Sequence, residues 1–330
     1  MNVFGGLHGG RERVVKTTGL VAATARWTTR LRGYEAHGIA IEPALDSIYS
    51  GDGWGVPSYA SMRIRRLDLG TGDEVATFRA FNGLRCSAIL DNGALLAVSD
   101  AKFFELDALT LEERARWDRR MPRYGNSLAV IDRTVVVADW MNPRVALVDL
   151  RTGGVRRRDA PEMTKVLARG SEPLLVGGSK AGGTWVVNVG AARVSELMAT
   201  RPAIDAALEP VGDSLAILVG LRGRVHANGT ELGGPSSALM TYGLADGHEA
   251  AYRLPRKVGR IAWGAHRMLL AGPGVVLSVG SALEDGVDLW TPPSDAHVVA
   301  MDADAGIVLT LVPDYTSAGA HLTCWDLDAR

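Results

Sequence analysis

The chain has 330 residues, of which 47% are hydrophobic and 22% charged, and its formal net charge is −1. This composition excludes a disordered or fibrous chain, and the balanced charge gives no reason to expect a protein that coats a polyanion. The 39 glycines and 14 prolines interrupt short apolar runs, which favours many turns over long helices.

The N-terminal residues 1–8 lack the basic start and apolar core of a secretory signal. No uninterrupted apolar run reaches the length of about 18 residues that a membrane span needs. Cys86 and Cys324 each lie in an alternating apolar segment, with no second cysteine or histidine at metal-binding spacing. We therefore expect reduced, packed thiols in a cytoplasmic protein that does not contact a membrane.

A short pattern recurs along the chain: an alternating strand, Asp-Leu or a substitute, a turn with Thr-Gly or Asp-Gly, and a second strand. The clearest copies are residues 64–72 and 145–153, and 239–247 is a looser one. The corresponding positions are 68, 107, 149, 188, 243, 280 and 326. Most intervals are roughly 40 residues, the period of a four-stranded propeller blade.

The segments between these hairpins supply two more strands in each unit. Almost continuous apolar sequence predicts innermost strands that are covered on both faces by neighbouring units. We place them near residues 38–42, 86–90, 127–131, 164–168, 203–208, 258–263 and 297–301. The sequence therefore predicts an all-β fold: a seven-bladed β-propeller with four-stranded antiparallel blades.

The seventh unit ends with its third strand at Trp325-Asp326-Leu327, so its outer strand has to come from elsewhere. Residues 25–30 parallel residues 115–120, the expected outer strand of the second unit, and we expect residues of about 22–30 to close the last blade. On this interpretation residues 1–330 are a single propeller domain with an N-terminal extension at 1–20. Residues 14–19 also resemble a third strand, which leaves eight blades as an alternative.

The Trp325-Asp326 pair and the Asp-Leu-x-Thr-Gly turns at 68–72 and 149–153 carry a family resemblance. With them the chain resembles the seven-bladed β-propellers of the WD-repeat and quinoprotein-like kind, at the level of architecture. It differs from typical WD repeats because no unit opens with their Gly-His pair.

The connections between second and third strands vary in length, and variable loops on one face of a repeat fold usually mark the binding face. The second strand ends in aspartate in four units, with aromatic residues nearby. These aspartates form either an acidic cup for a cation or amine, or turn caps that bond backbone N–H groups. The candidate ligand-binding residues are Asp52, Trp54, Tyr59, Asp100, Asp139, Trp140, Lys180, Arg222, His226, Asp314, Tyr315 and His321.

None of the seven histidines forms a short-range metal motif, and the sequence contains no phosphate loop or dinucleotide fingerprint. We therefore expect no metal or cofactor, and no catalytic residue can be named. The favoured function is a binding module that holds a small molecule, peptide or protein partner in the loop-rich funnel. The alternative is a propeller enzyme, a lyase, hydrolase or isomerase, that uses Asp, His, Tyr and Lys groups of the same funnel. Nucleic acid is not an expected partner, and a closed ring predicts a monomer.

Arginines cluster in three places that the pattern assigns to outer strands or their ends. One interpretation is a solvated edge that prevents sheets from associating, and the other is an acidic partner on the rim of blades one to three. The clusters are Arg63-Arg65-Arg66, Arg114-Arg116-Arg119-Arg120-Arg123 and Arg156-Arg157-Arg158.

Overall fold

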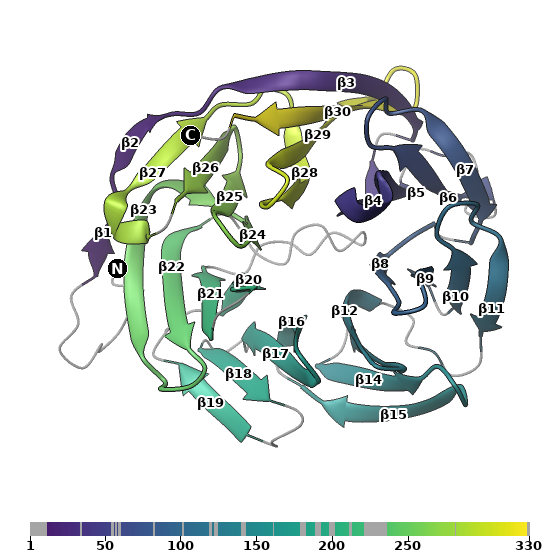
Figure 1. The fold of residues 1–330 in the computed structure, drawn as a ribbon, viewed down its shortest axis with the longest axis horizontal. Coiled ribbons are helices and arrows are strands. Elements are labelled where there is room, and N and C mark those ends of the chain that lie inside the picture. The colour runs from purple at the N-terminus through teal and green to yellow at the C-terminus, as the bar shows by residue number, and fades with distance from the viewer. Residues whose placement is uncertain are drawn as a thin grey trace.

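Seven β-sheets stand around a central axis and form a ring (Figure 1). The predicted all-β, seven-bladed propeller is thereby confirmed. The computed structural model describes residues 12–33, 35–53, 56, 58, 61–81, 83–100, 102–118, 121, 125–139, 143–160, 162–178, 183–188, 193–197, 202–210, 213–220, 236–280 and 282–328.

The first three blades follow one another along the chain, each with its innermost strand first and its outermost strand last. Blade one contains β4 (Ala36–Glu42), β5 (Ser47–Asp52), β6 (Arg63–Asp68) and β7 (Glu74–Arg79), with the 3₁₀ helix η1 (Pro43–Leu45) between the first two strands. Blade two contains β8 (Cys86–Ile89), β9 (Ala94–Ser99), β10 (Lys102–Asp107) and β11 (Glu113–Trp117). Blade three contains β12 (Gly125–Ile131), β13 (Thr134–Asp139), β14 (Arg144–Asp149) and β15 (Gly154–Asp159).

The remaining blades keep the same order, except that the last one takes its outer strand from the N-terminal region. Blade four contains β16 (Glu162–Arg169), β17 (Glu172–Gly178), β18 (Thr184–Asn188) and β19 (Arg193–Leu197). Blade five contains β20 (Ala203–Leu208), β21 (Ser214–Val219), β22 (Ser236–Gly243) and β23 (Glu249–Val258). Blade six contains β24 (Arg260–Trp263), β25 (Met268–Gly272), β26 (Val275–Val279), the 3₁₀ helix η3 (Leu283–Asp285) and β27 (Val287–Trp290). Blade seven contains β28 (His297–Asp302), β29 (Ile307–Asp314), β30 (Gly319–Leu327) and β3 (Ala23–Arg32).

The apolar strands are needed because each blade buries both of its faces. The described buried apolar residues form seven clusters, and each cluster lies between two neighbouring blades. Between blades one and two, for example, Tyr49 and Ile64 pack with Leu95 and Phe104. No blade could bury these surfaces alone, so the repeat is stable only as a complete ring.

The N-terminal segment at residues 12–32, which we call the strap, runs along the outside of three blades (Figure 1). Its strand β3 pairs antiparallel with β30, from Ala23 opposite Leu327 to Arg32 opposite Gly319. This pairing completes blade seven, as the sequence predicts.

The first part of the strap differs from the expected third-strand pattern. Strands β1 (Arg13–Val14) and β2 (Thr17–Leu20) pair in parallel with β23 and β27. They therefore become fifth, outermost strands of blades five and six instead of starting an eighth blade. The alternating pattern alone could not separate these cases because an added outer strand and a third strand have the same period.

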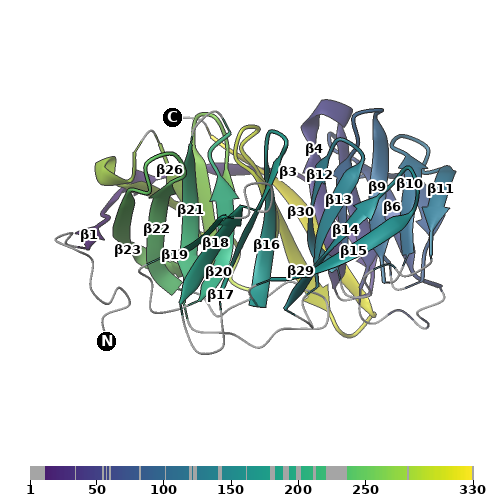
Figure 2. The ribbon, with the colours of Figure 1, turned by 90° about the horizontal axis from the view of Figure 1, so that it is seen from below.

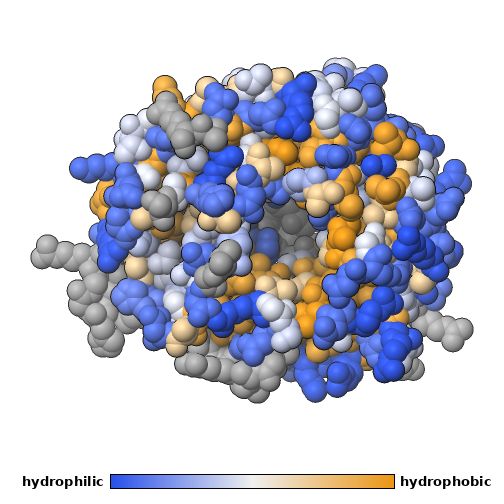
Figure 3. All heavy atoms as spheres, viewed as in Figure 1, coloured by the Kyte–Doolittle hydropathy of each residue, from blue (hydrophilic) through white to orange (hydrophobic). Residues whose placement is uncertain are grey.

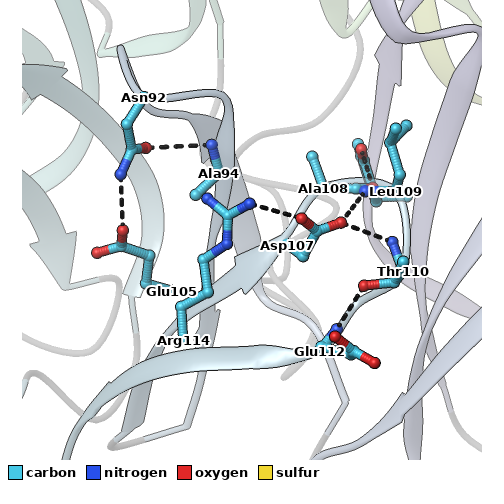
Figure 4. A network of polar contacts seen from close by, with 10 residues as sticks. Asn92, Ala94, Glu105, Asp107, Ala108, Leu109, Thr110, Glu112 and Arg114 are labelled. Atoms are coloured by element: carbon cyan, nitrogen blue, oxygen red, sulfur yellow. Dashed lines mark hydrogen bonds and ion pairs between the residues drawn. The ribbon is translucent and has the colours of Figure 1, made fainter.

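The recurring aspartate turn connects the third and fourth strands. In blade two, Asp107 Oδ1 accepts hydrogen bonds from the backbone N–H groups of Leu109 (2.9 Å) and Thr110 (2.8 Å), while Oδ2 lies 2.5 Å from Arg114 (Figure 4). Asp68 and Asp149 bond their own turns in the same way. These bonds to the charged form lower the pKa of Asp107 to about 2 and lower that of Asp149. The Asp-Leu-x-Thr-Gly motif is thus a turn cap.

Outer-strand tryptophans connect neighbouring blades. The Nε1 atom of Trp27, in blade seven, donates a 2.8 Å hydrogen bond to the carbonyl of Leu69, in blade one. The indole lies against Gly72 of the same turn, and Trp117 of blade two similarly lies against Gly153 of blade three. Both tryptophans lie on outer strands, as comparison of residues 25–30 with 115–120 predicts, but their registers differ: Trp27 faces Cys324, two residues before its turn position, and Trp117 faces Phe103, four residues before.

Both cysteines are free thiols, as predicted. Burial raises the pKa of Cys86 to about 12 and that of Cys324 to about 11. Each thiol is therefore protonated at neutral pH and packs as a small apolar side chain.

Candidate functional site

The two ends of the ring carry different connections. At one end, which we call the loop face, lie the connections from each second strand to its third strand and from each outer strand to the next blade. The β29–β30 hairpin projects from this end, whereas η1 lies at the opposite end (Figure 2). The expectation that the long second-to-third connections share one face follows from this topology.

Half of the predicted ligand-binding residues lie outside the described residues: Trp54, Tyr59, Trp140, Lys180, Arg222 and His226. The other six are Asp52, Asp100, Asp139, Asp314, Tyr315 and His321. The four aspartates lie where the second strands of blades one, two, three and seven end, in the places that the repeat assigns to them.

Asp52 is buried, with only 2% of its surface exposed. Its carboxylate pairs with the guanidinium of Arg65, which is equally buried, and accepts a 3.1 Å hydrogen bond from the backbone N–H of Arg63. Burial raises the pKa of Asp52, while the charges of Arg65 and Arg32 oppose that shift. Asp52 therefore holds the β5–β6 hairpin together from inside, and a cationic ligand could reach it only by displacing Arg65. Its ligand-binding role stays a prediction.

Arg65 also differs from the expected position of its cluster. It lies on β6, the third strand of blade one, and is 3% exposed, so it does not belong to the outer rim. Its neighbour Arg66 donates hydrogen bonds to Ser47 Oγ (2.7 Å) and to the carbonyl of Leu109 in blade two (3.0 Å). These arginines stabilise blade one and its contact with blade two.

Asp314 caps the β29–β30 hairpin. Its Oδ1 atom accepts hydrogen bonds from the backbone N–H groups of Thr316 (3.1 Å) and Ser317 (3.2 Å), and both hydroxyl groups of these residues bond its carboxylate. These bonds lower the pKa of Asp314. Here the turn-capping interpretation fits the geometry. The adjacent Tyr315 is 75% exposed at the tip of the hairpin, so a locked turn presents an aromatic ring to solvent.

The remaining described candidates lie apart from each other around the ring. Asp100 has a left-handed backbone (φ +47°) in the tight β9–β10 turn. Asp139 is the last residue of β13, opposite Arg144, and it is partly exposed. His321 is exposed on β30, opposite Arg30 of the strap. The structure thus places these residues on three different blades at the loop face.

Sequence reasoning missed a polar contact on the innermost strands. Lys165 Nζ of blade four lies 2.9 Å from Asp205 Oδ1 of blade five, and Asp205 Oδ2 accepts a 3.0 Å hydrogen bond from the N–H of Ile261 in blade six. One carboxylate therefore joins three consecutive blades. The available signal was Asp205, a charged residue inside the otherwise apolar innermost strand β20.

The centre of the ring is hollow, and apolar side chains surround much of its mouth on the face shown in Figure 3. The innermost strands also contribute partly buried apolar side chains that pack against the clusters between blades, among them Ile39, Ile41, Leu128 and Val130. Among the described residues, no group of three or more His, Cys, Asp or Glu side chains is arranged to hold a metal ion. The described part of the chain also contains no helix that is long and apolar enough to span a bilayer.

Comparison with known proteins supports the architecture. No protein-family model matches the chain, and no curated protein matches it either. Among solved structures it is similar to the Cps50 (Swd1) β-propeller domain of Myceliophteria thermophila, with a TM-score of 0.60 and 9% sequence identity over 91% of this chain and 98% of that one. At this identity the likeness concerns the fold alone. It supports the resemblance to WD-repeat-like propellers that the repeat indicates.

Proposed function

We propose that this propeller is a binding module that holds a peptide segment or surface of a partner protein on its loop face, around the mouth of the channel. The observation that carries the proposal is Tyr315, an exposed aromatic ring on a hairpin that the Asp314 carboxylate locks with four hydrogen bonds. Tyrosines held in a fixed conformation are typical anchors of protein interfaces because little entropy is lost when they bind.

A second exposed aromatic supports a wide contact surface. Phe81, 49% exposed, lies in the connection from β7 to β8 on the same face, and its carbonyl accepts a hydrogen bond from the Ser99 hydroxyl at the end of β9. Asp52 and Asp314 meanwhile bond the groups of their own hairpins. Carboxylates engaged in this way shape the loops and favour binding over general acid–base chemistry.

A photo-reactive benzoylphenylalanine in place of Tyr315 tests the proposal in the cells that express the protein. The matched control carries the same residue in place of Leu109, which is 51% exposed in the β10–β11 turn at the opposite end of the ring. We expect a cross-linked protein from position 315 that is absent from position 109. The recovered partner should bind the purified chain, and Tyr315→Ala should weaken that binding at least tenfold.

Equal cross-linking from both positions would contradict a specific loop face. Mass-spectrometric detection of a chemically altered ligand after incubation with the purified protein would instead favour the enzyme alternative. Tyr315→Ala should remain folded, because this side chain is largely exposed in the free protein, and thermal unfolding verifies this.

A further inference from the structure

The outer strand β15 of blade three carries arginine where five other blades carry large apolar residues and blade seven carries Thr29. In each blade we compare the residue of the fourth strand that pairs with the third-strand residue four positions before the recurring turn position. That position holds an aromatic residue in blades one, two, five and six, and leucine in blade four: Phe78, Trp117, Tyr252, Trp290 and Leu197. In blade three the residue opposite Val145 is Arg158.

The other positions of β15 also depart from a packed strand. Arg156, Arg157 and Arg158 are all exposed, although consecutive residues of a strand point to opposite faces. Arg156 and Arg158 form no ion pair with any residue that the structure describes. Arg156 and Arg158 therefore have no ionic role visible among the described residues, and they lie on the outermost strand of their sheet (Figure 1).

The ring itself shows that such outer edges accept another strand. In blades five and six, β1 and β2 add in parallel to the fourth strands β23 and β27. Backbone hydrogen bonds hold them, including Val15 N–H to the Arg253 carbonyl (2.9 Å) and Val21 N–H to the Leu289 carbonyl (3.0 Å). The strand β1 pairs at Tyr252, the register equivalent of Arg158.

Ion pairs accompany the added strand: Arg13 of β1 pairs with Glu284 of η3, and an acidic residue flanks β1. Glu12, at the start of the strap, lies 2.5 Å from the guanidinium of Arg253 on the outer strand of blade five. An acidic side chain flanking the added strand thus meets an arginine of the strand that receives it. Charge-assisted pairs of this kind add register and specificity to backbone hydrogen bonding.

We propose that the outer edge of β15 is a docking site for an extended acidic segment of a partner protein, which adds to blade three as a fifth strand. Backbone hydrogen bonds to the edge would hold the segment, and carboxylates on one of its faces would meet Arg156 and Arg158, which share a face of β15. The same arginines repel the β15 edge of a second copy, so the site selects against self-association while attracting an acidic strand.

The probe is a fluorescein-labelled octapeptide of alternating glutamate and valine, measured by fluorescence anisotropy against the full chain. We expect saturable binding that weakens at least tenfold in R156E/R158E. The matched control R114E/R116E changes the net charge equally on β11, where both arginines already pair with Asp107 and Glu113, and should change binding less than twofold. Thermal unfolding verifies that both variants are folded.

Two further measurements separate strand addition from attraction of any polyanion. N-methylation of either the glutamates or the valines blocks one edge of the peptide, and one of these two peptides should bind at least tenfold more weakly. The peptide should also slow deuterium exchange of the amides of β15 and not of β11. The proposal would be overturned if the peptide did not bind or if the two double variants weakened binding equally. It would also be overturned if both methylated peptides bound equally tightly, or if an eight-nucleotide oligothymidylate bound as tightly as the peptide.

Discussion

Aspartates at strand ends have two different structural roles in this ring. Asp107 and Asp314 are partly exposed and bond backbone N–H groups of their own turns. Asp52 is buried against Arg65. The sequence places all three at strand ends, but it cannot separate the two environments because burial depends on which side chain of the neighbouring strand faces the carboxylate. The arginine pattern assigns Arg65 to the outer rim and therefore does not predict its buried ion pair with Asp52.

The capped turn of blade two predicts a pH-dependent contribution to stability. Because the folded pKa of Asp107 is lowered to about 2, its stabilising effect is complete above the unfolded pKa, near 4, and is lost as the pH falls toward 2. Asp107→Asn should therefore lower the free energy of unfolding at neutral pH. The difference from wild type should fall to about half by pH 3. Urea unfolding at several pH values measures both.

Asp118→Asn is the matched control. This exposed residue follows β11 in the same blade, and no described backbone N–H bonds its carboxylate. Its substitution should leave the free energy of unfolding at neutral pH unchanged. A constant difference between Asp107→Asn and wild type from pH 7 to pH 3 would show that the charge of Asp107 does not stabilise the turn.

At the scale of elements, the contact between an outer strand and the next turn joins the blades. Trp27 on β3 lies against the Gly72 turn of blade one, where a Cβ atom would lie 2.5 Å from Trp27 Cε3. Gly72 also has a left-handed backbone, with φ +77°. The repeat revealed both the tryptophan and the Thr-Gly turn. It could not reveal that they touch, because they belong to different blades.

Two glycines separate the backbone effect from the contact between blades. Gly93 has a similar φ of +72° but nothing within 4 Å of its added Cβ atom. Gly93→Ala should cost about 1 kcal/mol through the left-handed conformation alone. Gly72→Ala should cost about 2–4 kcal/mol, because overpacking against the indole adds about 1–3 kcal/mol. Chemical denaturation of both variants measures the difference, and equal losses would mean that the indole moves away freely.

At the scale of the whole molecule, period, blade number and the closing strand could all be predicted. A blade of this size with apolar innermost strands has few ways to bury both faces of its sheet, so the repeat predicts a closed ring of blades. The pairing of β1 and β2 could not be predicted, since an added outer strand shows the same alternating pattern as a third strand. Nor could the contact between Lys165 and Asp205, which depends on the packing of three blades.

Two truncations distinguish the parts of the strap. Removal of residues 1–21 deletes β1 and β2 with the buried Val15 and Val21, and should lower the free energy of unfolding by about 2–5 kcal/mol while leaving the ring closed. Removal of residues 1–33 also deletes β3 and exposes the edge of β30, so this variant should aggregate. Size-exclusion chromatography and urea unfolding test both, and equal behaviour of the two variants would contradict a closing role for β3.

Ring closure by the strap also sets the order of events on the ribosome. Arg26 and Asp326, which pair across β3 and β30, are 300 residues apart in the chain. At synthesis rates of about 5–20 residues per second, β3 emerges roughly 15–60 seconds before its partner exists. During that interval the ten-residue strand β3 has no strand to pair with, and the last blade can assemble only when translation of its third strand ends. The nascent protein thus completes its circle in a single late step.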